Sequence, residues 1–337
     1  MQPKIDRRAF LKLAGCAGVA SALPLVSPAL GLASLGRGLK VAQEARMLMG
    51  TVVAVTVVDA SAAKAQAGLE AAFARMAALT PIFDRHQAGG PVAQLNAEGR
   101  LNHLTPELTG VLGLAQRVHQ DTNGAFDVTV APVLDAYRAS FAQSGRPPAA
   151  SVLEHAMAAI GGLRVDGSGL VFTAAGAGVT LDGLAKGWIA DQGLAVLRAA
   201  GVTRALINAG GDIAALGQRG EGQPWRVAVS DPHDPLKAKV VVKLNGGAIA
   251  TSGNYEVFFD KDQLYHHIID PQAGRSPRTD VSVSVRAPQA ALADALSTAC
   301  FVMHPPQAMA YLKSRGLTGM ILTRQGQRLQ SEGFTAA

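Results

Sequence analysis

A carboxylate and a hydroxyl near the C-terminus have the types and spacing that metal chemistry requires. Asp294 and Thr298 lie four residues apart in a stretch, residues 289–303, that is predicted to be helical, and Ser297 lies beside them. On a helix, residues four apart share a face. Oxygen donors of this kind suit Mg²⁺, which takes few protein ligands and completes its shell with water and phosphate. Taken alone, the run fits an ordinary helix with its polar residues in solvent better than it fits a metal site. The choice between the two therefore depends on the rest of the chain.

Two glycine-rich junctions have a composition suited to a phosphate ligand. Residues 208–212 follow an expected strand, where Gly210 and Gly211 would let the backbone approach a ligand and aim N–H groups at an anion. Residues 181–187 form an expected strand-to-helix junction, in which Lys186 could neutralise a phosphate. An ordinary glycine turn and a solvated lysine are the plain alternatives. The sequence has neither GxGxxG nor GxxxxGKS/T, so a Rossmann dinucleotide site and a P-loop are unsupported.

A histidine pair and an aromatic residue complete the candidate chemistry. His266 and His267 lie in a stretch expected to be a strand, where neighbouring side chains point to opposite faces. At most one of them can therefore enter a given site, where it could act as a general base near neutral pH. A hydrogen-bonded surface histidine is the plain alternative. Phe126 could line a pocket for a ring, although a core position explains it as well. No GxSxG or HExxH motif is present, so serine-hydrolase and zinc-peptidase chemistry are unsupported.

The N-terminus predicts an export signal rather than part of the fold. Asp6-Arg7-Arg8 is a twin-arginine element, and an uncharged apolar stretch follows over residues 13–36. Prolines within this stretch and its weak hydrophobicity argue against a permanent transmembrane helix. We expect a twin-arginine signal peptide over residues 1–33, a linker over residues 34–45 and one domain over residues 46–332. The expected location is the periplasm, and whether the leader is cleaved or keeps the protein at the membrane stays open.

Composition excludes several classes of function. The chain has 337 residues, 48% of them hydrophobic, which suffices for one large domain or two small ones. The formal net charge of +6 includes four basic residues and one acidic residue of the leader, so the remainder is close to neutral and has no nucleic-acid-binding signature. Of the two cysteines, only Cys300 lies outside the leader, which excludes an intramolecular disulfide in the mature chain. We expect Cys300 in the core.

The elements that must position these residues mix helices and strands without a regular βαβ alternation, which favours an α+β fold. Helices are expected at residues 62–79, from Thr105 to about Asn123, and at residues 184–200, 289–303 and 306–315. Strands are expected at residues 50–58, 163–165, 171–173, 179–181, 204–207, 225–229, 238–244, 255–259, 265–268, 281–285 and 320–323. Residues 84–96 and 143–150 are expected to be loops. No internal repeat or low-complexity linker is present, so we expect one globular unit.

Taken together, these runs resemble the ApbE family, the FAD:protein FMN transferases. Each matching segment is short, but they occur in the family's order and span nearly the whole mature chain. The segments are residues 49–51, 95–96, 124–129 with Pro132, 181–187 with Asp191, 208–212, 251–253, 267–271 with Gly274, and 293–298. The resemblance implies a single ApbE-like (T-fold-like) α+β unit of mixed, mostly antiparallel sheets and packed helices.

The resemblance also implies an activity. FAD would bind in a cleft with Mg²⁺ at its pyrophosphate, and a threonine or serine hydroxyl of a partner protein would attack the FMN-side phosphorus. AMP would leave, and FMN would stay joined to the partner by a phosphoester. Such a reaction mainly needs positioning and charge neutralisation, to which a metal contributes Lewis acidity. The implied acceptors are flavin-bearing subunits of membrane electron-transport complexes.

Roles for individual residues follow from the same resemblance. Asp294, Thr298 and the carbonyl of Gly183 would hold the metal. Lys186 would contact the FAD phosphates, and His267 is the candidate base for the incoming hydroxyl. The remaining positions that the resemblance assigns to FAD binding are Met49, Ala125, Phe126, Asp127, Thr180, Gly210, Gly211 and Ile268.

The chain departs from the family pattern at several positions. Ser297 stands where some members carry a second aspartate, which would leave less charge at the metal. Thr180 replaces a carboxylate and Asp182 replaces a glycine, and residues 87–94 lack the usual serine and glutamate. These changes leave the adenine-side contacts undefined. Two other functions therefore stay open: a Mg²⁺-dependent FAD pyrophosphatase that yields FMN and AMP, and a non-catalytic periplasmic FAD carrier.

Overall fold

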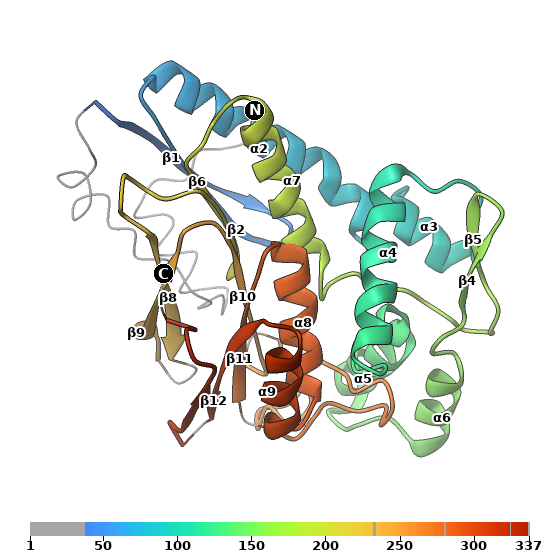
Figure 1. Ribbon diagram of the computed structural model, residues 1–337. Coiled ribbons are helices and arrows are strands. Elements are labelled where there is room, and N and C mark those ends of the chain that lie inside the picture. The colour runs from blue at the N-terminus through green and yellow to red at the C-terminus, as the bar shows by residue number, and fades with distance from the viewer. Residues whose placement is uncertain (1–37, 232–233, 256, 280, 324, 336–337) are drawn as a thin grey trace.

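An eight-stranded sheet forms the centre of the molecule in the computed structural model, which describes residues 38–335 apart from residues 232–233, 256, 280 and 324 (Figure 1). Its strands are, in spatial order, β1 (Lys40–Leu48), β2 (Thr51–Asp59), β6 (Ala205–Ala209), β7 (Asp212–Leu216), β10 (Gly247–Gly253), β11 (Val281–Ala287), β12 (Thr318–Thr323) and β13 (Arg328–Gln330). Every neighbouring pair is antiparallel. The prediction of one α+β unit with mostly antiparallel sheets is confirmed.

Helices cover one face of this sheet (Figure 1). They are α2 (Ala62–Phe83), α7 (Ala185–Ala199), α8 (Ala290–Val302) and α9 (Pro305–Ser314). The opposite face is covered by a two-stranded ribbon of β8 (Trp225–Asp231) and β9 (Asp234–Leu244). Side chains alternate between the two sides, as the pleat requires: on β7, Ala214 packs on the helix side, whereas Ile213 and Ala215 pack toward the ribbon.

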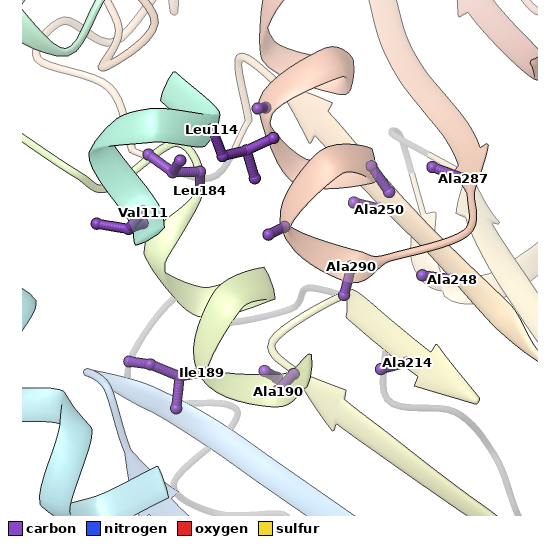
Figure 2. Close-up of a cluster of buried hydrophobic side chains, with 14 of the residues drawn as sticks. Val111, Leu114, Leu184, Ile189, Ala190, Ala214, Ala248, Ala250, Ala287 and Ala290 are labelled. Carbon is purple, nitrogen blue, oxygen red and sulfur yellow. The ribbon is translucent and has the colours of Figure 1, made fainter. Parts of the chain in front are cut away.

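Small side chains let the helices lie close to the sheet. Figure 2 shows Ala248 and Ala250 of the sheet beside Ala290 of α8 and Ala190 of α7, all in one buried cluster. At one point the approach admits no side chain at all, because a Cβ on Gly187 of α7 would lie 2.4 Å from the carbonyl oxygen of Ala290. The start of α7 is therefore fixed against the start of α8.

Residues between α2 and α7 form a second layer beside the sheet (Figure 1). It contains α3 (Pro91–Glu98), α4 (Pro106–Asp121), the 3₁₀ turn η2 (Val128–Val130), α5 (Ala131–Ser144), α6 (Ala150–Ala158) and a small sheet of β3 (Arg100–Leu101), β5 (Gly169–Phe172) and β4 (Leu163–Asp166). Helix α4 begins as predicted, because Thr105 accepts a hydrogen bond from Leu108 N and Pro106 occupies the first turn. No helix among the described residues is long and apolar enough to cross a membrane.

Several expectations about elements were wrong. Residues 91–98 form α3 instead of a loop, because Gly90 and Pro91 start a helix that Gly99 ends in the left-handed conformation. Residues 179–181 are not a strand. The described residues of 255–259 and 265–268 form no strands either; among them, Phe258 and His266 make an isolated bridge.

The domain boundary also differs from the prediction. Residues 40–45, expected in the linker, form most of β1 and pair with β2 from Lys40 opposite Asp59 onward. The expected signal peptide at residues 1–33 lies outside the described residues.

Candidate functional site

A cavity of about 420 Å³ lies where the ends of several sheet strands meet the start of α7, one side of α8 and the chain around η2. Every residue that the sequence analysis assigned to the site lines this cavity, with the exception of Gly211. Residues far apart in the sequence, from Met49 to Thr298, are thus brought together.

Gly211 has a role in the adjacent turn instead. Its N–H donates to Asn208 Oδ1 at 2.8 Å, and its φ of +105° suits glycine alone. Gly210 does line the cavity, and a Cβ there would lie 2.5 Å from Thr51 Oγ1. The two glycines therefore set the turn between β6 and β7 and keep the backbone open at the cavity wall.

The predicted metal donors come from two elements and meet in the cavity. Asp294 and Thr298 lie on α8, and both line the cavity together with Gly183, which precedes α7. A Cβ placed on Gly183 would lie 3.5 Å from Thr298 Oγ1, which shows how closely the two approach. Asp294 is only 4% exposed, so the alternative of a helix with its polar residues in solvent is excluded.

These donors fit Mg²⁺ by their chemistry. A carboxylate, a hydroxyl and a main-chain carbonyl are all hard oxygen donors, and three protein ligands leave room for water and a ligand phosphate. Across the part of the chain that the structure describes, no group of three histidine, cysteine, aspartate or glutamate residues could hold a metal ion by itself. Ser297 contributes nothing directly, because it is fully buried and bonds Asp294 O at 2.9 Å.

Helix α8 is held in place from α7. Asp191 accepts hydrogen bonds from Ala290 N and Ala291 N, both at 2.9 Å, and so caps the N-terminus of a helix to which it does not belong. The N–H of Gly187 donates to Asp294 Oδ2 at 3.3 Å. Burial raises the pKa of Asp191 to about 6, although the two N–H bonds oppose the shift. The sequence analysis noted Asp191 only as a match to the family and gave it no role.

An ion pair joins the first turn of α7 to the start of β7. Lys186 Nζ lies 3.1 Å from Asp212 Oδ2 and 3.5 Å from the carbonyl oxygen of Asp182. Asp212 is buried, which raises the pKa of its carboxyl, whereas the charge of Lys186 acts in the opposite direction. Asp212 was missed as a site residue, although it ends the 208–212 segment, because its pairing depends on a lysine of a distant segment.

The two histidines differ as predicted, although they do not lie on a strand. His266 is fully buried, its Nδ1 accepts from Ile268 N at 3.3 Å, and its Nε2 lies 3.2 Å from Pro277 O. His267 lines the cavity instead, with Nδ1 3.0 Å from Val257 O. Because a carbonyl oxygen only accepts, Nδ1 carries the proton and Nε2 keeps its lone pair.

The charge state of His267 suits a base. Burial lowers the pKa of its ring below the usual range, and the positive charge of Lys186 lowers it further. The hydrogen bond to Val257 and the charge of Asp182 act in the opposite direction. His267 is therefore neutral at physiological pH and able to accept a proton at Nε2.

The residues expected around the flavin ring differ in their roles. Phe126 is buried, and Met49 has a φ of +54° at the turn before β2. The Asp127 carboxylate is occupied by Thr129 N at 2.7 Å, Thr129 Oγ1 at 2.6 Å and the His119 ring at 3.3 Å, so it shapes the loop. Thr180 Oγ1 accepts from Asp182 N at 3.3 Å and fixes the adjoining turn.

Some cavity residues were not foreseen. Arg138 and Leu134 enter from α5, a helix that the sequence analysis did not predict. Asp84 and Phe83 enter from the end of α2, just before the stretch 87–94 in which the chain departs from the family pattern. Ser252 lines the wall beside Thr298, and only its place in the matched segment 251–253 pointed to it.

Fold and cavity together define a class: an α+β protein whose site combines hard-oxygen metal donors, a lysine and a neutral histidine, suited to a phosphate-containing ligand. The family model of the ApbE family matches residues 49–321, and the chain belongs to this family.

Known proteins resemble the chain over most of its length. A FAD:protein FMN transferase of Klebsiella pneumoniae (strain 342) is 30% identical over 294 residues, which cover 83% of each chain. Another from Treponema pallidum (strain Nichols) is 31% identical over 316 residues, 86% of each chain. The crystal structure of the ApbE protein from Thermotoga maritima aligns with a TM-score of 0.79 and 28% identity, covering 88% of this chain and all of that one.

Proposed function

We propose that the protein is a Mg²⁺-dependent FAD:protein FMN transferase, which joins FMN through a phosphoester to a threonine or serine of a partner protein and releases AMP. The observation that carries the proposal is the convergence of Gly183, Asp294 and Thr298 with Lys186 and His267 in one cavity. When bound there, Mg²⁺ would supply Lewis acidity at the pyrophosphate. The names of the relatives support the same activity.

Different residues of the chain have different roles in the reaction. Lys186, oriented by Asp212, neutralises charge on the FAD pyrophosphate. His267 Nε2 takes the proton from the acceptor hydroxyl as its oxygen bonds to the FMN-side phosphorus. The bond from that phosphorus to the bridging oxygen breaks, and AMP leaves with the bridging oxygen. The apolar wall at Phe126 and Ile268 contacts the flavin ring.

Mass spectrometry tests the proposal. The protein without its leader is incubated with FAD, Mg²⁺ and a candidate acceptor that carries an Asp-x-x-Ser/Thr-Gly-Ala-Thr-like site. The expected result is an acceptor heavier by one FMN less one water. Asp294→Ala should slow the gain by about 10²-fold or more, since a metal contributes several kcal/mol to such a transition state. Asp262→Ala, which removes an exposed carboxylate, is the matched control.

The other outcomes separate the alternatives. Free FMN and AMP with no mass gain on any acceptor would favour the pyrophosphatase. Unchanged FAD in the presence of Mg²⁺ would favour the carrier.

We also propose that the protein is exported through the twin-arginine pathway and acts in the periplasm on a flavin-bearing subunit of a membrane electron-transport complex. Arg7 and Arg8 of the sequence support this proposal. Cell fractionation of the full chain and of an Arg7→Lys, Arg8→Lys variant tests it. Retention of both forms in the cytoplasm would contradict it.

A further inference from the structure

A row of hydroxyl groups runs from the cavity wall into the core at the predicted metal donors. Thr298 Oγ1 is 3.2 Å from Ser252 Oγ, and Ser252 Oγ is 2.7 Å from Ser297 Oγ. Ser297 in turn bonds the main-chain oxygen of Asp294 at 2.9 Å. Ser252 belongs to β10 and the other three residues to α8, so the row joins the sheet to the helix that carries the predicted metal donors.

Only one assignment of the hydroxyl protons lets all three contacts of this row be hydrogen bonds at the same time. A hydroxyl has one proton to donate, whereas a carbonyl oxygen can only accept. Ser297 must therefore donate to Asp294 O, and its oxygen can only accept from Ser252. Ser252 has then used its own proton, so its oxygen accepts from Thr298. The proton of Thr298 consequently points away from the cavity, and the lone pairs of its Oγ1 remain for a ligand in the cavity.

We propose that Ser252 is a positioning residue that makes Thr298 a cation ligand by turning the Thr298 proton away from the cavity. This inference rests on the proposed Mg²⁺ site. A hydroxyl binds a cation through its oxygen lone pair, and a proton directed at the cation would oppose binding. Ser297 acts one step further back, because it accepts the proton of Ser252 and so keeps Ser252 an acceptor. The role also gives a reason for Ser297 at a position facing away from the cavity.

Burial makes this arrangement persistent. Ser252 is 9% exposed and Ser297 is fully buried, so solvent competes for these hydroxyls far less than it would for an exposed row. In Ser252→Ala, Thr298 loses its acceptor, and its proton is free to turn toward the cavity. In Ser297→Ala, Ser252 recovers its proton and can donate it to Thr298, which again turns the Thr298 proton toward the cavity.

The test is cation affinity rather than activity. The protein is titrated with Mn²⁺ in the presence of FAD, and free Mn²⁺ is followed by electron paramagnetic resonance. Groups that orient metal ligands typically change affinity by about 10–100-fold when they are removed. We expect a loss of about tenfold for Ser252→Ala and a loss in the same direction for Ser297→Ala. Ser252→Thr, which keeps the hydroxyl, should recover affinity.

Ser282→Ala provides the matched control. Ser282 is a buried serine of the neighbouring strand β11, paired with Gly253, and its Oγ makes no hydrogen bond in the structure. Its removal should leave Mn²⁺ affinity at the wild-type value. Kinetics give a second readout. Ser252→Ala and Ser297→Ala should need more Mg²⁺ for half-maximal rate, and both should approach the wild-type rate at saturating Mg²⁺.

The outcomes separate this inference from the proposed function. One outcome is that the wild-type protein binds Mn²⁺ with the same affinity as Ser252→Ala and Ser297→Ala. That result would overturn the positioning role of Ser252 and leave the proposed metal site intact. A wild-type protein that binds no Mn²⁺ with FAD present would overturn the proposed metal site, and the positioning role of Ser252 with it. If Ser252→Ala does not fold, Ser297→Ala decides alone, because unchanged affinity there contradicts the proton directions that we assign to this row.

Discussion

Single residues in this cavity are distinguished by where their protons lie. His267 has its proton on Nδ1 and a lowered pKa, so the neutral form dominates at neutral pH. Its neighbour His266 has both ring nitrogens bonded inside the core. Two adjacent residues of the same type thus have separate surroundings, one at the cavity and one in the core.

We predict that His267→Ala lowers the rate of FMN transfer by about 10²–10⁴-fold, the range for losing a general base, and leaves stability nearly unchanged. Because the neutral ring is the active form, the wild-type rate should fall as the pH drops through the lowered pKa of His267 and stay level above it. The variant should lack this acidic limb. Transfer rates between about pH 5 and pH 8 measure it, with exposed His103→Ala as the control. A variant that keeps the acidic limb would assign the base elsewhere.

Cys300 is expected to be inert. It is 1% exposed on α8, and burial raises the pKa of its thiol to about 12, so the reactive thiolate is absent at neutral pH. In the chain without its leader, a thiol reagent such as DTNB should leave the native protein unmodified and react once guanidinium unfolds it. Rapid labelling of the folded protein would show that α8 opens readily.

Among the elements, the contact between α7 and α8 positions the residues that we propose as metal donors. Gly187→Ala would place a Cβ 2.4 Å from a main-chain oxygen, which cannot move without shifting a helix. We predict a loss of unfolding free energy of about 1–3 kcal/mol together with weaker Mg²⁺ binding. Gly113→Ala in α4 is the matched control, since its Cβ would meet only the Arg117 side chain at 3.7 Å, and it should be neutral or stabilising. Denaturant titration and metal affinity measure both variants.

The cap at the start of α8 predicts a pH dependence. Because the folded pKa of Asp191, about 6, exceeds its ordinary value of 3.8, the folded state holds this proton more tightly than the unfolded state. The stabilisation is complete below about pH 3.8 and is lost as the pH rises through about 6, with a span of up to about 3 kcal/mol. The stability advantage of the wild type over Asp191→Asn should therefore shrink between about pH 4 and pH 7. Unfolding free energies at both ends test this, and an advantage that grows with pH would contradict it.

The elements that the sequence predicted well carry their own local signals. Helix α4 has a threonine cap and a proline at its start. The helix predicted at residues 289–303 agrees with α8 to within one residue at each end. Helices α5 and α6 were missed. Residues 255–268 are rich in strand-forming types, yet they pair only with one another, which composition alone does not reveal.

For the site, too, local sequence signals were predictive and contacts between distant segments were not. The order of motifs along the chain predicted most of the cavity lining, because family segments carry it, but not the residues that enter from α2 and α5. The partners behind that lining were not predictable: Asp212 with Lys186, Asp191 with α8, and Ser252 with Thr298. Each of these pairs joins segments that are distant in sequence, so only the folded arrangement defines it.

At the scale of the whole molecule, the sheet depends on residues that lie before the first matched motif. Strand β1 pairs with β2 along its full length, and Ala42 is buried in the helix-side core. Arg46 of β1 also lies 2.6 Å from Glu70 and stacks over Phe73 on α2. The first strand is thus fastened both to the sheet and to the helix that covers it.

A truncation at residue 46, the predicted domain start, should therefore be costly, whereas a chain that begins at residue 38 should be as stable as the protein without its signal peptide. Loss of residues 40–45 removes the pairing with residues 54–59 and turns most of β2 into an open edge, which invites association between chains. Each lost ladder hydrogen bond is worth about 0.5–1.5 kcal/mol, so a fall of several degrees in Tm and concentration-dependent aggregation are expected. Thermal unfolding and light scattering of the two chains, side by side, measure this. Equal Tm values would mean that the sheet holds without β1 and that the unit begins at β2.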